Sequence, residues 1–189
     1  MICLLKGLFK SAAKVGEQGR NGKKKGGGKQ EKNIIVGLNN GALYGTSTGA
    51  NPLVDLDPLN TIPNVAIART IIDPNNQTTA YVTLSAFGQS SVWKTTNLNN
   101  NPPTWNAVST GLPAVPVNAF AVNPLNSNEI FAGSDVGVFS SVNGGTSWFP
   151  AGTGLPVVAV FGMAVTAGAK LRIATHGRGM WEISIAGAL

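Results

Sequence analysis

Beyond Asn33, short apolar runs alternate with groups of Gly, Asn and Pro. Most of these runs are about four to eight residues long and rich in Val, Ile, Thr and aromatic residues, as β-strands are. No window of about eleven or more residues in this part shows the period of an amphipathic helix. The run VNAFAV at Val117–Val122 is apolar at almost every position, which indicates sheets covered on both faces. The pattern predicts an all-β protein.

The pattern also repeats within the chain. Residues 71–113 align with residues 120–156, and both segments contain a strand, a turn and a Trp before they end in Thr-Gly-Leu-Pro. Trp105 falls on Trp148 in this alignment. The segment Leu171–Ile183 aligns with Glu129–Ser141 without a gap.

A repeated unit of four short strands over about 40–50 residues is typical of a β-propeller blade. We therefore expect a partial propeller with two full and two partial four-stranded antiparallel blades. The predicted blades span approximately residues 33–60, 61–113, 114–156 and 157–185. Because a propeller ring takes more blades than two full ones, we expect missing blades or self-association to cover the open ends.

Charge separates the first 32 residues from the rest. The chain carries 14 Lys and Arg against 8 Asp and Glu, and nine of the 14 basic residues lie before Asn33. Residues 15–33 have no apolar face, and residues 1–32 are predicted to be a disordered basic tail or a misassigned start, followed by the propeller at 33–189. The near-neutral remainder argues against a nucleic-acid-binding fold. A contact of Lys23–Lys25 with an anionic surface is the alternative use of the tail.

Composition also limits the cofactor chemistry. A single Cys3 and a single His176 exclude an internal disulfide framework and a His- or Cys-rich metal site, and no cofactor is expected. No apolar run is long enough to span a membrane. The apolar start Met1–Phe9 is short and interrupted by Lys6, so it is not a clear signal peptide.

The most specific motif is a polar hairpin that begins at Ser141 and ends at Trp148. The residues expected to build it are Ser141, Asn143, Gly145, Ser147 and Trp148. The Asn143 side chain can accept hydrogen bonds from backbone N–H groups of the turn, and Gly145 can adopt a positive φ. Thr95, Asn97 and Trp105 form a looser first copy with an insertion. These roles are structural, because the residues support a turn and imply no reaction.

These residues resemble the BNR/Asp-box repeat, S-x-D-x-G-x-T-W. The segment from Val65 to Ile183 is similar to the C-terminal blades of secreted bacterial Asp-box propellers, a group that includes sortilin-like proteins and xyloglucanase-like glycosyl hydrolases. The matching segments are Val117–Pro124, Ile130–Trp148, Gly154–Pro156 and Leu171–Glu182. Asn143 replaces the usual Asp. The resemblance implies an extracellular or periplasmic location.

Glycoside hydrolysis needs two carboxylates across a bound sugar. Asp73 lies in a repeated turn, and Glu129 and Glu182 are expected at solvated strand edges, so no catalytic residue is assigned. Asp135, His176 and Arg178 lie in equivalent turns of the last two blades, and they are the candidates for a ligand-binding face.

Two functions remain open from the sequence. The first is a non-catalytic Asp-box propeller fragment that serves as a structural scaffold or binds a protein or a glycan. The alternative is the C-terminal fragment of a secreted, xyloglucanase-like glycoside hydrolase whose catalytic carboxylates are on missing blades.

Overall fold

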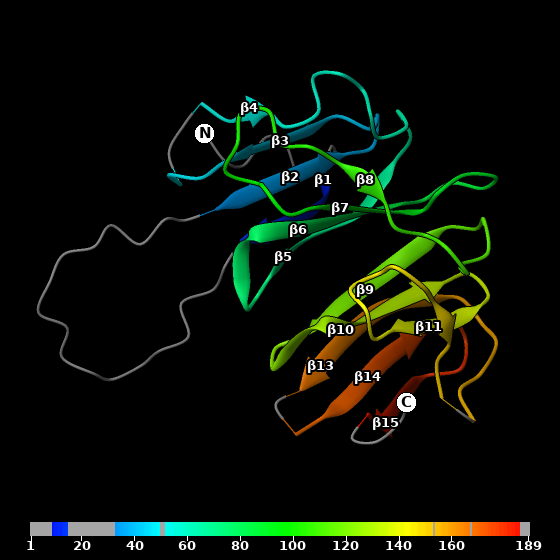
Figure 1. Cartoon of the computed structure of the whole chain (residues 1–189). Coiled ribbons are helices and arrows are strands. Elements are labelled where there is room, and N and C mark those ends of the chain that lie inside the picture. The colour runs from blue at the N-terminus through cyan, green and yellow to red at the C-terminus, as the bar shows by residue number, and fades with distance from the viewer. Residues whose placement is uncertain (1–8, 15–32, 50–51, 153, 167, 186–189) are drawn as a thin grey trace, which may run out of the picture.

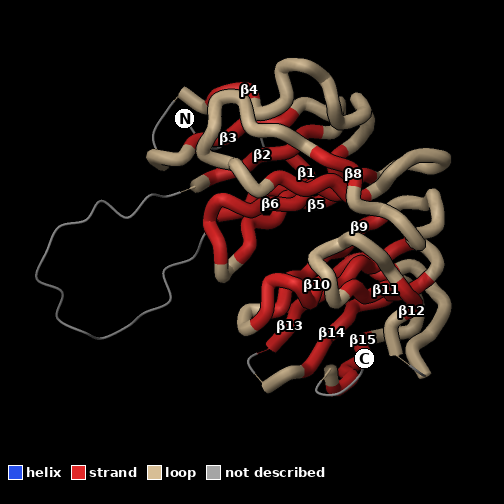
Figure 2. The backbone as a smooth tube through the Cα atoms, viewed as in Figure 1, coloured by secondary structure: helices blue, strands red, loops and turns tan. Residues whose placement is uncertain are grey.

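The computed structural model describes residues 9–14, 33–49, 52–152, 154–166 and 168–185, and for 9–14 it describes the backbone. The described residues form strands and loops without a helix (Figure 2). The first sheet contains β1 (Phe9–Lys14), β2 (Ile34–Leu38), β3 (Leu43–Thr46) and β4 (Val54–Asp55). The second contains β5 (Ile67–Asp73), β6 (Asn76–Leu84), β7 (Val92–Thr95) and β8 (Asn106–Ala107). The third contains β9 (Val117–Asn123), β10 (Asn126–Ser134), β11 (Gly137–Ser141) and β12 (Phe149–Pro150). The last contains β13 (Val160–Thr166), β14 (Lys170–Thr175) and β15 (Met180–Ser184).

In every sheet the strands are paired antiparallel in chain order, without a crossover. The first strands of neighbouring sheets contact one another, β1 with β5, β5 with β9 and β9 with β13. Figure 1 shows the four sheets following one another from the N-terminal sheet at the top to the C-terminal sheet at the bottom. This arrangement confirms an all-β partial propeller, and we number the sheets blades 1 to 4.

Strand β1 was not predicted. It lies within residues 1–32, which the sequence pattern placed outside the propeller, and it pairs along β2 from Phe9↔Leu38 to Lys14↔Ile34. Blade 1 therefore has four strands, where the sequence predicted a partial blade. The remaining residues of the predicted tail, 1–8 and 15–32, lie outside the described part of the chain.

The register of blade 4 also differs from the ungapped sequence alignment. Ile130 pairs with Ser141 in blade 3, and Leu171 pairs with Ile183 in blade 4. Two residues lie between the paired Ser134 and Gly137, whereas three lie between the equivalent Thr175 and Gly179. Strand β14 is therefore shifted by one position while β15 keeps its alignment. As a result Arg172, and not Ile173, occupies the position of Phe131.

Each pair of neighbouring blades encloses its own apolar cluster. Ile67, Val117 and Val160 begin the inner strands of blades 2, 3 and 4, and each has no exposed surface. They belong to three separate clusters, which lie between blades 1 and 2, 2 and 3, and 3 and 4. A blade thus buries its apolar surface mainly by stacking on its neighbours.

Two glycines permit this close stacking. Gly37 and Gly133 lie at equivalent positions on the second strands of blades 1 and 3. A Cβ at Gly37 would overlap the side chain of Ile67, and one at Gly133 would overlap Val160. The glycines therefore allow the next inner strand to approach the sheet.

Two tryptophans tie blades 2 and 3 to the blades that precede them. The Trp105 Nε1–H donates to the Leu56 carbonyl at 2.9 Å, and the Trp148 Nε1–H donates to the Val108 carbonyl at 2.7 Å. Leu56 and Val108 both follow the outermost strand of the preceding blade. The indoles are 5% and 2% exposed. Trp105 and Trp148, which align in the sequence repeat, thus have the same packing role in their blades.

Trp148→Phe keeps an aromatic ring but removes the interblade hydrogen bond. We expect the free energy of unfolding to fall by about 1–3 kcal/mol, because the Val108 carbonyl loses its donor in a largely buried place. Urea-induced unfolding measures this loss. Trp181→Phe is the matched control, since Trp181 is 39% exposed and donates within its own blade to the Arg178 carbonyl. Equal losses in both variants would contradict an interblade role.

Candidate functional site

The hairpin between β11 and β12 is held by its own side chains. The Asn143 Oδ1 accepts from the Ser147 N–H at 2.9 Å and from the Ser141 hydroxyl at 2.8 Å, and its Nδ2 donates to the Ser147 Oγ at 2.8 Å. The Ser141 Oγ also accepts from the Gly145 N–H at 3.0 Å. Gly145 has a φ of 97°, which a residue with a side chain rarely adopts. The backbone hydrogen bond expected of the Asn143 side chain is thus present.

The first copy of this turn forms the corresponding bonds despite its insertion. The Asn97 Oδ1 accepts from the Thr95 hydroxyl at 2.8 Å and from the Thr104 N–H at 2.9 Å. Thr95, Asn97 and Thr104 therefore take the places of Ser141, Asn143 and Ser147. Both turns precede the tryptophan that bonds the previous blade, so they position an interblade contact.

A lysine and a tyrosine connect blade 2 to the second of these turns. The Lys94 Nζ donates to the Gly144 carbonyl at 3.0 Å and lies 5.4 Å from the centre of the Tyr81 ring. Burial lowers the pKa of Lys94, and burial together with the nearby Asp73 carboxylate raises the pKa of Tyr81. Tyr81 in turn stacks on Phe120 with ring centres 5.0 Å apart. This cluster is a structural contact between blades.

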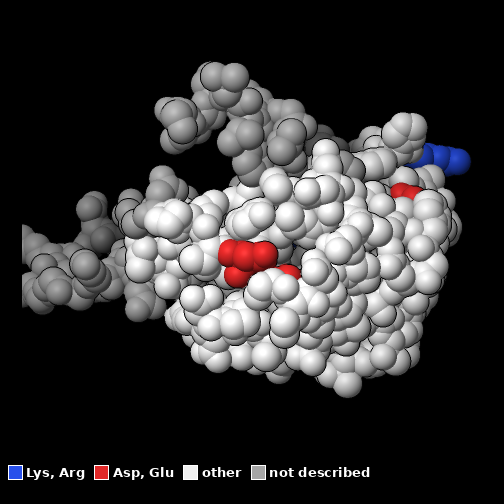
Figure 3. Space-filling model, turned by 90° about the horizontal axis from the view of Figure 1, so that it is seen from above, with Lys and Arg blue, Asp and Glu red and all other residues white. Residues whose placement is uncertain are grey.

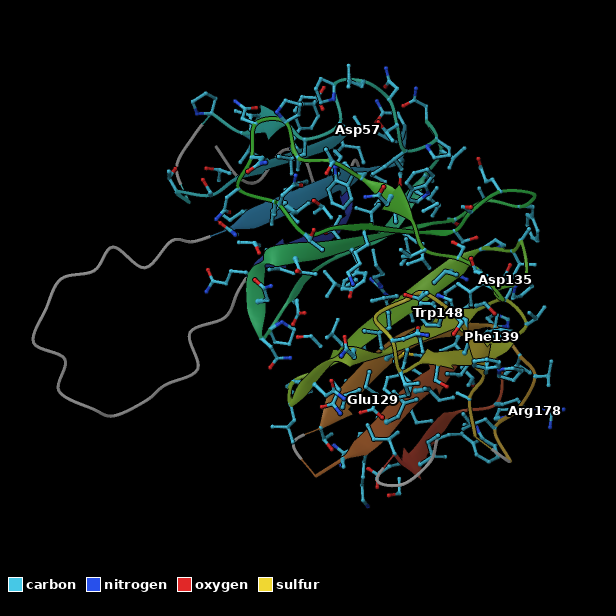
Figure 4. All side chains as sticks on the ribbon, in the orientation of Figure 1. Asp57, Glu129, Asp135, Phe139, Trp148 and Arg178 are labelled. Atoms are coloured by element: carbon cyan, nitrogen blue, oxygen red, sulfur yellow. The ribbon has the colours of Figure 1, made fainter. Side chains whose placement is uncertain are left out.

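The three candidate ligand residues lie at one end of the blades. Asp135 belongs to the turn after β10, and His176 and Arg178 belong to the equivalent turn after β14. Figure 4 shows Asp135 and Arg178 at the same end, with Glu129 at the opposite end. The structure therefore places the predicted residues on a common end of the molecule.

Two further residues at this end were missed by sequence reasoning. The Asn118 Nδ2 donates to the Asp135 Oδ1 at 2.7 Å, and the Phe161 ring packs edge-on against His176 with centres 6.0 Å apart. Asn118 and Phe161 occupy equivalent bulge positions on β9 and β13. Phe161 is 49% exposed. Because these bulge positions carry different residues in each blade, the repeat contains no signal for them.

Arg69 joins this end from another blade. It lies on β5 of blade 2, and its Nη2 donates to the Phe161 carbonyl of blade 4 at 2.7 Å. The guanidinium thus reaches past blade 3 and holds the backbone beneath the exposed Phe161 ring.

The carboxylates in loops and turns serve local structure. Asp57 accepts from the Thr61 N–H at 2.9 Å and from the Ile62 N–H at 2.8 Å. Asp73 accepts from the Asn75 N–H at 2.8 Å, as its repeat equivalent Asn123 does from the N–H two residues on. The turn role predicted for Asp73 is confirmed.

The remaining carboxylates lie on strands or face other side chains. Glu129 is 9% exposed and accepts a hydrogen bond from the Asn123 side chain, so its predicted place at a solvated edge is wrong. Glu182 pairs with Lys170 at 2.5 Å and with Arg172 at 2.6 Å, and these hydrogen bonds lower its pKa. Each of these carboxylates already has partners within the chain. Asp135 is the acidic residue that also belongs to the candidate ligand end.

The open side of blade 4 is a shallow groove. Its lining includes apolar Gly162, Ala164 and Met180 together with Arg172 and Glu182. Tyr81 and Phe131 occupy the position of Arg172 in blades 2 and 3, where they are buried against the following blade. In blade 4 this position instead carries an exposed ion pair.

Few other features suggest chemistry. Among the described residues, no three His, Cys, Asp or Glu side chains gather in an arrangement that could hold a metal ion. The described part also contains no helix with the length and apolarity to cross a membrane. The face seen in Figure 3 is largely uncharged, with scattered acidic side chains and little basic surface.

Comparison with known proteins gives matches in structure alone. No family model matches the chain, and no curated protein matches it. The GH74 xyloglucanase from Xanthomonas campestris matches with a TM-score of 0.63 at 12% identity, over 96% of this chain and 30% of that one. The GH74 enzyme from Niastella koreensis matches with a TM-score of 0.59 at 19% identity, over 79% of this chain and 26% of that one. A YCF48 protein bound to a D1 peptide matches with a TM-score of 0.56 at 15% identity, over 92% of this chain and 48% of that one.

These likenesses show the fold. The chain spans about a third or less of the two GH74 structures and about half of the YCF48 structure. The described part of the chain is therefore a partial β-propeller of the type found in GH74 glycoside hydrolases and in YCF48.

Proposed function

We propose that this chain is a four-blade part of a glycoside-hydrolase-type propeller, and that it binds a polysaccharide without hydrolysing it. The observation that carries the proposal is the likeness to a GH74 xyloglucanase over 96% of the chain. In this proposal the catalytic carboxylates belong to other blades of the enzyme, and the whole protein acts outside the cytoplasm. This is the alternative drawn from the sequence, combined with the binding role of the first hypothesis.

The proposed binding surface is the end that carries Asp135, Asn118, Phe161, His176 and Arg178. The Asp135 carboxylate can accept hydrogen bonds from sugar hydroxyls, and the exposed Arg178 guanidinium can donate to them. The half-exposed Phe161 ring offers an apolar face against which a sugar ring can pack. The hydrogen bond from Arg69 to the Phe161 backbone would hold that platform in place.

We further assign the two polar turns to the Asp-box type, with Asn97 and Asn143 in the place of the Asp. The support is the shared set of side-chain hydrogen bonds and the tryptophan that follows each turn. In this assignment the turns are architectural and take no part in ligand binding.

A peptide ligand is the second candidate. It is favoured by the match to a YCF48 propeller whose structure contains a bound D1 peptide. This candidate corresponds to the scaffold or protein-binding function drawn from the sequence.

Xyloglucan in an affinity gel should retard the full chain, while a reducing-sugar assay should detect no release. Asp135→Ala should weaken the retardation about tenfold, because a hydrogen bond to a charged group contributes about 1.5–3 kcal/mol. Asp55→Ala is the control, since Asp55 lies on blade 1 and caps the Asp57 N–H. Release of reducing sugar by this chain that disappears in Asp135→Asn would contradict the non-catalytic proposal. Absence of retardation would contradict the polysaccharide.

Asn143→Ala removes both the acceptor and the donor at the centre of the second polar turn. We expect the free energy of unfolding to fall by about 1–2 kcal/mol, because the Ser147 N–H loses its partner. Asn143→Asp keeps the acceptor oxygen and should lose less. Thermal unfolding at neutral pH measures the order of the three proteins. An Asp variant as unstable as the Ala variant would show that the Oδ1 bonds are unimportant.

A further inference from the structure

A cavity lies between blades 1 and 2, at the end of the molecule that carries the polar turns. Its wall is formed by residues after β3, by residues around β4 and by the loop after β7. In an antiparallel meander the turns after second and third strands lie at opposite ends, so this cavity is far from the end that carries Asp135. Its volume of about 360 Å³ lies within the range of small-molecule sites.

The longer polar turn of blade 2 supplies one wall of this cavity. In blade 2 the central Asn97 bonds the N–H of Thr104, seven positions further along the chain. In blade 3 the equivalent Asn143 bonds the N–H of Ser147, only four positions further along. Residues 98–101, which belong to the longer turn, all line the cavity. The insertion thus contributes to a possible site, whereas the rest of the turn is architectural.

Asn33, which lines the cavity from blade 1, has a buried acceptor to spare. The residue is 1% exposed, and its Nδ2 donates to the Gln77 carbonyl at 2.7 Å and to the Asn99 Oδ1 at 3.1 Å. Because a backbone carbonyl can only accept, the bond to Gln77 fixes which amide atom is the nitrogen. The Asn33 Oδ1 accepts no hydrogen bond within the described part of the chain. A buried acceptor without a partner costs free energy, which a donor from a ligand would recover.

The lining of the cavity is polar but uncharged. Amide and hydroxyl side chains, including those of Asn100, Thr46 and Ser47, share the wall with apolar side chains such as Leu56 and Leu98. None of the described lining residues is ionisable. Divalent cations are bound mainly by carboxylates, and phosphate groups by Arg or Lys, so neither kind of ion fits this lining. Amides and hydroxyls can both donate and accept, which suits a neutral ligand that also does both.

We propose that this cavity binds one neutral sugar ring, either as a free sugar or as the end unit of a glycan. A sugar ring has hydroxyls around its rim and C–H groups on its faces, which match the mixed amide, hydroxyl and apolar lining. One ligand hydroxyl donates to the Asn33 Oδ1, and others bond the side chains of Ser47 and Asn100. The site is separate from the proposed polysaccharide-binding end and does not depend on it.

The test is an NMR titration of the isotope-labelled full chain with D-glucose, D-xylose or D-galactose. At least one of these sugars should cause saturable shifts in the side-chain amide signal of Asn33 and in the backbone amide signals of Thr46–Thr48 and Asn99–Asn101. Shifts confined to Asp135 and Arg178 would overturn this proposal and leave the proposed function standing. Absence of a saturable shift with all three sugars would overturn it as well.

Two further ligands define the chemistry of the site. A phosphorylated glucose should bind more weakly than D-glucose, because the described lining has no cation to pair with the phosphate. Tighter binding of the phosphorylated sugar would overturn the assignment to a neutral ligand. Cellotriose distinguishes the two sources of the sugar ring. Binding of both cellotriose and a free sugar supports the end unit of a glycan, and binding of the free sugar alone supports a free sugar.

Variants test the protein side. Replacing Asn33 could disturb folding, because its amide bonds blade 2, so the double variant Ser47→Ala with Asn100→Ala is used instead. It removes a hydroxyl and an amide from two walls of the cavity and should weaken sugar binding about tenfold. Asn39→Ala is the control, since Asn39 is exposed in the turn after β2. Equal affinities of the double variant and this control would overturn the proposal. Asp135→Ala should retain the shifts at the cavity, and their loss would overturn the separation of the two sites.

Discussion

The fold depends on the stacking of one thin sheet on the next. A single sheet of four short strands cannot bury both of its faces, so its stability comes from the clusters it forms with its neighbours. The inner-strand residues Ile67, Val117 and Val160 have no exposed surface because each is enclosed by two blades. Apolar burial has no preferred direction, and the indole hydrogen bonds of Trp105 and Trp148 add directional contacts between blades. Apolar burial thus holds the blades together, and the indole bonds help to set how blades 2 and 3 are placed on the blades that precede them.

The hydrogen bonds of the polar turn could be predicted from the sequence because they join residues that are close together in the chain. Asn143 bonds residues within four positions of itself, and its residue type already specifies those bonds. The buried tryptophans were readable because they recur. The all-β class could be predicted because the length and spacing of the apolar runs are also local properties of the sequence.

The sequence did not predict features that depend on contacts between residues far apart in the chain. Strand β1 joins blade 1 through pairing with β2 across the intervening residues 15–32, and its short sequence FKSAAK has no strong strand pattern. Glu129 is buried and accepts a hydrogen bond from the Asn123 side chain, a contact that depends on the pairing of β9 with β10. At the candidate site the sequence indicated Asp135 and His176 through equivalent turns, but their partners Asn118 and Phe161 belong to neighbouring strands and vary between blades. The sequence repeat predicts the residues and contacts that recur in every blade, but it cannot predict contacts made by residues that occur in one blade alone.

Blade 4 shows how one changed position alters an interface. Ile35, Tyr81 and Phe131 share one position in blades 1 to 3, and each is at most 3% exposed against the next blade. Arg172 takes this position in blade 4 and pairs with Glu182, which itself takes the position of Lys94 and Ser140. Charged groups resist burial against an apolar sheet because their desolvation is costly. The face of blade 4 therefore favours contact with water or a polar partner.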